Sequence, residues 1–100
     1  MSLIMRLEGA QAAAAVNAGA ATTLSEARGV YCYQSGSTAR LITVQDPSSG
    51  SDVVVGTITL PAAAGSQLYL AKNSHEEIFA ANAEVLFTPF SIAAVPTSHY

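Results

Sequence analysis

Beyond residue 28, short apolar segments with alternating polar positions are separated by clusters of Gly, Ser, Asp and Pro, which form turns. This pattern is typical of β-strands with one face against a core. The segments are rich in β-branched and aromatic residues, which favour strands. We predict strands at residues 29–34 (GVYCYQ), 39–45 (ARLITVQ), 53–60 (VVVGTITL) and 66–72 (SQLYLAK).

The last three of these strands are joined by two short loops, residues 46–52 and 61–65. A parallel pair would need a long crossover, so the pattern predicts an antiparallel meander. Gly56 lies inside the 53–60 strand, which indicates a β-bulge or a close neighbouring backbone.

Residues 84–94 (EVLFTPFSIAA) are apolar at both odd and even positions. We therefore expect a strand that is covered on both faces. Pro89 has no N–H for a ladder, which predicts a sheet edge or a break at that position.

Residues 73–81 break the strand pattern. Ser74 followed by Glu77 matches the S-x-x-E capping box that begins a helix. The sequence therefore predicts one short helical turn near residues 74–80, which would cover an end of the sheet through Ile78 and Phe79.

The first 28 residues allow two interpretations. The alanine run in residues 8–16 has high helix propensity, whereas the alternation of Leu3, Met5 and Leu7 and the flanking glycines favour a strand, which we prefer. The expected fold is a single all-β domain over residues 1–100, an antiparallel β-sandwich or barrel-like domain. Its terminal arms, residues 1–6 and 96–100, are expected to make contacts with other chains.

The chain is 50% hydrophobic and only 11% charged, compared with about 25% charged residues in an ordinary soluble domain. So few charges cannot coat the surface in the usual way, which indicates a subunit of an assembly. The four basic residues are scattered, and a nucleic-acid site needs a basic cluster. No apolar segment approaches the ~20 residues of a membrane span, and polar residues interrupt the start of the chain too often for a secretion signal.

Candidate chemistry is sparse. His75 beside Glu76 and Glu77 lacks the spacing of metal ligands, because adjacent positions point in different directions. Asp46 and Asp52 bracket a loop but lack the alternating acidic pattern of calcium loops. Cys32 lies in a strand with no identifiable base, so a buried thiol is expected. We predict no catalytic residue, no metal site and no cofactor.

The order of features from residue 41 onward resembles that of small virion structural proteins of tailed bacteriophages, especially marine cyanobacterial phages. The resemblance covers about three-quarters of the chain and consists of the segments LITVQD, SSGSD, VGTITLP, QLYLAK and NSHEEIFAA, preceded by NAGAATTL. It implies a β-rich, non-enzymatic particle protein, such as a capsid decoration (cement) protein or a ring subunit of the neck or tail. Such a protein would be assembled into the virion in the host cytoplasm.

We therefore expect a virion subunit that buries apolar strand surface and its arms against copies of itself and other virion proteins, and that binds neither nucleic acid nor membrane. The alternative is a carbohydrate- or receptor-binding module on a fibre, using Tyr31, Tyr33, Tyr69 and Tyr100. The residues expected in protein–protein contacts are Leu3, Ile4, Met5, Pro96, His99 and Tyr100.

Overall fold

The structure, a computed structural model, describes the backbone of residues 2–95 and the side chains of residues 5–92. Its strands are β1 (Ser2–Leu7), β2 (Ala12–Ala13), β3 (Gly29–Gln34), β4 (Arg40–Asp46), β5 (Val53–Leu60), β6 (Gln67–Ala71), β7 (Glu77–Ala80) and β8 (Val85–Val95). One short 3₁₀ turn, η1 (Ala18–Ala20), lies between β2 and β3. Within the described part of the chain, no helix has the length and apolar character to cross a membrane.

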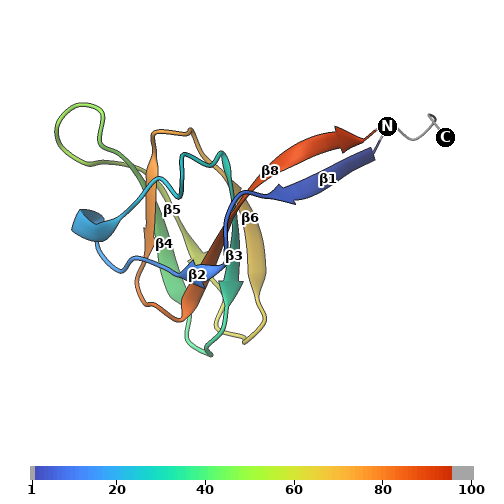
Figure 1. Cartoon of the computed structure of the whole chain (residues 1–100). Helices are drawn as coiled ribbons and strands as arrows, with labels where there is room; N and C mark the ends of the chain where they lie inside the picture. Colours follow the sequence, from blue (N-terminus) through green and yellow to red (C-terminus); the bar gives the residue numbers. More distant parts are fainter. Residues whose placement is uncertain (1, 96–100) are drawn as a thin grey trace.

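The strands form two antiparallel sheets (Figure 1). One has the order β1-β8-β3-β6, with β2 also paired to β8, and the other has the order β5-β4-β7. The prediction of an all-β, sandwich-like fold is confirmed, and the sheets do not close into a barrel. The predicted strands at 29–34 and 53–60 have the observed bounds, and the other three differ by one residue at both ends.

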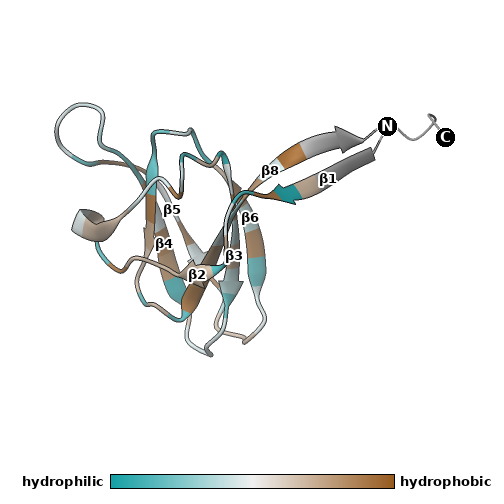
Figure 2. Ribbon diagram, in the orientation of Figure 1, coloured by the Kyte–Doolittle hydropathy of each residue, from teal (hydrophilic) through white to brown (hydrophobic). Residues whose placement is uncertain are grey.

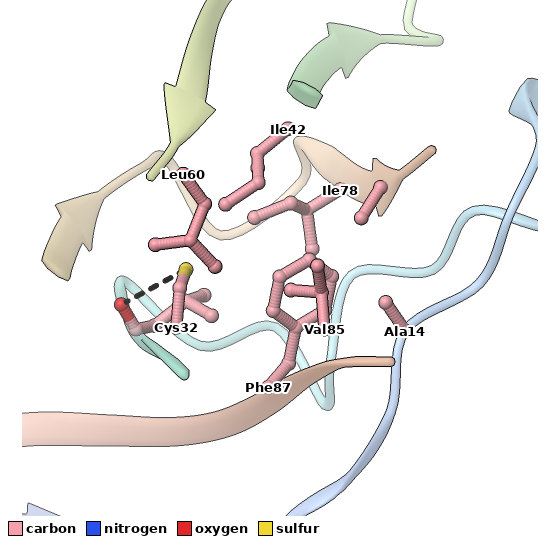
Figure 3. Packing of buried hydrophobic residues seen from close by; sticks show 9 residues of the cluster. Ala14, Cys32, Ile42, Leu60, Ile78, Val85 and Phe87 are labelled. Carbon is pink, nitrogen blue, oxygen red and sulfur yellow. Dashed lines mark hydrogen bonds between the residues drawn. The ribbon is translucent and has the colours of Figure 1, made fainter. Parts of the chain in front are cut away.

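The core lies between the two sheets and is small and mostly aliphatic (Figure 3). Val30, Cys32 and Phe87 face it from the larger sheet, whereas Ile42 and Ile78 face it from the smaller one. Leu68 and Leu70 of β6 are partly buried against this cluster, while Gln67 and Tyr69 point outward, as their alternation predicts.

The prediction of a three-strand meander is wrong. β4 and β5 do form an antiparallel pair, but the chain then crosses to the other sheet, where β6 pairs with β3. The physical reason is that each sheet of a sandwich needs the other to cover its apolar face, and a short loop can equally lead to a neighbouring strand or across the core.

The predicted helical turn near residues 74–80 is also wrong. Residues 77–80 form strand β7, paired with β4, and only a tight turn at 74–75 precedes it. The expected Ser74–Glu77 pairing is replaced by one a residue earlier, in which the Asn73 N–H donates to Glu76 Oε1 at 2.7 Å. Alternation decides the outcome, because strand geometry buries Ile78 and Ala80 together on the core side.

The ambiguous N-terminal segment is largely extended. Within the alanine-rich residues 8–16, Ala12 and Ala13 form strand pairs with Phe87 and Leu86 of β8, and no helix forms there. The segment then runs along the outer edge of β7, where the Ile78 N–H donates to the Thr22 carbonyl and the Ala80 N–H to the Ala15 carbonyl. This covers a strand edge that would otherwise be free.

Pro89 lies inside the continuous strand β8. The interruption occurs instead in the segment of the same chain that runs beside it, between β1 and β2. β1 ends at Leu7 and β2 begins at Ala12, so no strand needs a donor from residue 89 on that side. The segment between them passes close to the proline, since the Glu8 N–H donates to the Pro89 carbonyl at 2.8 Å and a Cβ on Gly9 would lie 3.0 Å from the proline ring.

Candidate functional site

The feature that departs most from a closed domain is a two-stranded ribbon that projects from the body (Figure 1). β8 pairs with β3 only up to Phe90, opposite Gly29, and its remaining residues pair with β1 alone. The radius of gyration is 14.5 Å, compared with about 13 Å for a compact chain of this length. A two-stranded ribbon in water is marginally stable at best, so the projection is a candidate contact surface.

The described side chains of the ribbon include several exposed apolar groups. Leu7 and Ile92 are 60% and 59% exposed, and Met5 is 40% exposed. In Figure 2, β8 keeps hydrophobic colouring where it has left the body. An apolar groove of about 540 Å³ lies at the base of the ribbon, lined by residues that include Met5, Tyr69, Phe90 and Ile92, with Arg28 as its one charged lining residue.

Strand β5 is a second apolar surface. Seven of its eight residues are exposed and only Leu60 is buried. Val53, Val54 and Val55 are each 55–60% exposed, and Ile58 is 44% exposed. The register with β4 shifts beside Gly56, because Val44 pairs with Gly56 and Gln45 with Val54. The predicted bulge is thus present, and it leaves Val55 as the extra residue.

The outer edges of β1, β5 and β6 lack a neighbouring strand in the part of the chain that the structure describes. Natural sheets protect such edges with charged residues, proline, bulges or covering segments. β1 contains one charged residue, Arg6, and β5 contains neither a charge nor a proline. Of the three free edges, those of β1 and β5 carry the exposed aliphatic side chains, so they are the candidates for strand pairing with other chains.

Three tyrosines form a row on the outer face of the larger sheet. The ring centroids of Tyr31 and Tyr69 are 5.2 Å apart, and those of Tyr31 and Tyr33 are 6.4 Å apart. Tyr69 also packs edge-on against Phe90 at 5.8 Å. Tyr69 is 61% exposed and borders the groove, whereas Tyr31 and Tyr33 are half-buried.

The fold brings Asp46, His75 and Glu76 together, with potential ligand atoms within 4.8 Å of one another. The sequence prediction considered His75 only together with Glu76 and Glu77, and it missed Asp46. In the structure, Asp46 Oδ2 lies 3.4 Å from His75 Nε2. The two carboxylates also have structural partners, since Asp46 accepts the Ser48 N–H and Glu76 accepts the Asn73 N–H. Hydrogen bonds from Ser48, with a smaller contribution from His75, hold the pKa of Asp46 below its usual value. These hydrogen bonds explain the cluster structurally, because they stabilise the turn after Asp46 and the turn before Glu76.

Cys32 is fully buried in the core and has no base beside it. Burial raises the pKa of its thiol to about 12, so the group is protonated at neutral pH. The expectation of a buried thiol is confirmed, and Cys32 cannot act as an exposed nucleophile.

We expect Cys32 to be unreactive in the folded protein. A chromogenic disulfide reagent at pH 8 should modify none of it in native buffer and one thiol per chain in strong denaturant. The chain has a single cysteine, so the denatured sample provides the full-signal control. Rapid native-state modification would contradict the described core.

Of the residues predicted to make contacts, Leu3, Ile4 and Met5 lie in β1, on the projecting ribbon. Pro96, His99 and Tyr100 lie outside the described residues. The β5 edge was missed as a contact surface, although its signal is visible in the sequence. Three consecutive valines before a glycine break the alternation expected of a strand with one buried face.

No family model, curated protein or solved structure matches this chain.

Proposed function

We propose that the protein is a non-enzymatic structural subunit of a tailed-phage virion, either a capsid decoration protein or a ring subunit of the neck or tail. The observation that supports this most strongly is the pair of apolar strand edges, on the ribbon and on β5. The resemblance of the sequence to small phage virion proteins is the reason for proposing a virion as the assembly. The low proportion of charged residues is consistent with a surface that is mostly covered by neighbouring subunits. Its partners are copies of itself and other virion proteins.

The mechanism is burial of apolar surface together with completion of strand hydrogen bonds. Each Å² of apolar surface removed from water contributes about 25 cal/mol. The backbone groups on a free edge are already extended and in register, so a neighbouring strand can pair with little reorganisation. Nucleic acid and membrane have no part in this mechanism.

Deletion of Met1–Met5 is expected to release the protein from its assemblies while leaving a folded domain. The deletion removes most of β1, which pairs only with the projecting part of β8 and contributes no described residue to the core cluster. Sedimentation velocity at micromolar concentration measures the assembly, and circular dichroism checks the fold. A truncated chain that assembles like the full-length protein would show that the ribbon is not the contact.

The position on a particle is tested separately. A closed ring formed by the full-length chain alone supports a neck or tail subunit, whereas a monomer supports a decoration protein that docks on a preformed lattice. Mass spectrometry of purified particles of the encoding phage tests the virion assignment itself. Presence of the chain only in the lysate, and not in the particles, would overturn it.

A second candidate function, binding of carbohydrate, is favoured by the tyrosine row. Tyr69 is exposed beside an apolar groove, and an aromatic ring next to a groove can stack against a sugar face. Binding on a glycan array would support this function, whereas a silent array would leave the row as packing surface.

A further inference from the structure

We propose that β5 of one copy pairs antiparallel with β1 of the next, so that the three-stranded sheet of one subunit continues into the ribbon of its neighbour. This inference rests on the proposed assembly function and specifies its contact. The occupant of the β1 edge is a second copy of this chain.

The free edges of β1 and β5 are similar in length and composition. β1 runs over six residues and β5 over eight, and each has one strand neighbour in the described structure. Neither strand contains a proline, and no described segment covers either edge. The two edges belong to different sheets and do not pair within one copy. The third free edge, that of β6, is shorter, with five residues, and its exposed large apolar side chain is Tyr69 rather than an aliphatic group.

The exposed charges near the two edges are complementary. Two of the four basic residues are already in use, because Arg40 pairs with Glu84 at 3.1 Å and Lys72 is buried. Arg6 and Arg28 are both exposed, and neither forms an ion pair within the described residues. Both lie at the base of the ribbon. Asp52, which directly precedes β5, is also exposed and forms no ion pair there.

These charges select a register. With β5 antiparallel to β1, Asp52 of one copy can lie opposite Arg6 of the other, which places Val53 opposite Met5 and Val54 opposite Ile4. A shift by two residues in one direction would place Asp52 opposite Glu8, and like charges directly opposite are destabilising. A shift by two in the other direction would place Asp52 opposite Ile4, without a charged partner. In the favoured register, Val53 extends the apolar face formed by Met5 and Ile92, which pair with each other on the ribbon.

The contact is heterologous, because each copy uses a different edge on each side. Such contacts form a ring when the rotation closes and a filament when it does not. Pairing of β5 with β1 can therefore produce the ring that a neck or tail subunit would form.

Mixed cysteine cross-linking tests the pairing. Met5→Cys and Val53→Cys are made in separate chains, both at exposed positions, and Cys32 stays silent because it is buried. Residues directly opposite in a strand pair have Cβ atoms about 4.5–5.5 Å apart, close enough to form a disulfide after small adjustments. After mixing and mild oxidation, covalent dimers should form in the mixture and in neither variant alone.

Thr59→Cys is the matched control, because it is exposed on β5 but lies beyond the end of β1 in this register. Mixing it with Met5→Cys should give at least about tenfold less dimer, because those cysteines lack the high effective concentration of a paired contact. Dimers from Met5→Cys alone would show that two β1 edges pair with each other and would overturn the proposal. Absence of dimers while sedimentation still shows assembly would overturn this contact but leave the structural function standing. Absence of both dimers and assembly would overturn the contact together with self-assembly.

Discussion

Replacement of Phe87 with alanine lowers the free energy of unfolding by about 3–5 kcal/mol, the range expected for a buried phenylalanine. Phe87 is only 3% exposed and lies at the centre of the small core between the sheets. Domains of this size are stable by about 5–15 kcal/mol, so the variant should lose a large part of its stability. Urea denaturation followed by circular dichroism measures the change.

Ile92→Ala is the control for this substitution. Ile92 lies on the same strand but is 59% exposed on the ribbon. In the monomer its replacement should change the unfolding free energy by no more than about 0.5 kcal/mol. A Phe87→Ala variant as stable as this control would show that β8 does not supply the core as described.

The strands were predictable from the sequence because their signals are local. β3 and β5 are each a run of strand-forming residues bounded by turn residues, and both have the bounds that the pattern indicates. The sheet in which each strand lies was not predictable. Residues 61–66 connect β5 to a strand of the other sheet, and nothing in such a short loop distinguishes that crossing from a hairpin.

The segment around residue 75 shows how two local signals can conflict. Ser74 and Glu77 have the spacing of a capping box, but Ile78 and Ala80 have the spacing of a strand with one buried face. Pairing with β4 decides in favour of the strand, because four register pairs and a buried face outweigh a single capped turn. That outcome depends on β4, which lies about thirty residues away in sequence.

One of the two proposed contact edges could be predicted from the sequence and the other could not, because strand order is not a local property. The apolar arm at residues 3–5 stands out in the sequence, and the structure places it on the ribbon. The exposure of β5 follows from its position at the edge of the smaller sheet, and sequence alone does not give strand order. The approach of Asp46 to His75 likewise depends on how β4 and β7 are arranged.

Replacement of Val54 with lysine should abolish assembly while leaving the monomer folded. Val54 is 60% exposed on the free edge of β5, so its side chain contributes little to the core. A lysine on an edge strand is a common natural protection against pairing, because burial of its ammonium without a partner is costly. We expect association to weaken at least about a hundredfold, or about 3 kcal/mol, measured by sedimentation across a concentration series.

Thr59→Lys provides the matched comparison, because it adds the same charge to the same strand beyond the proposed pairing register. Both variants should have unfolding free energies within about 0.5 kcal/mol of the parent chain. Loss of assembly in Val54→Lys alone would locate the contact in the first half of β5. Equal loss in both variants would indicate a general effect of added charge, and unchanged assembly in Val54→Lys would exclude this edge from the contact. The pair of variants therefore separates the particular strand edge from the overall scarcity of charge in the chain.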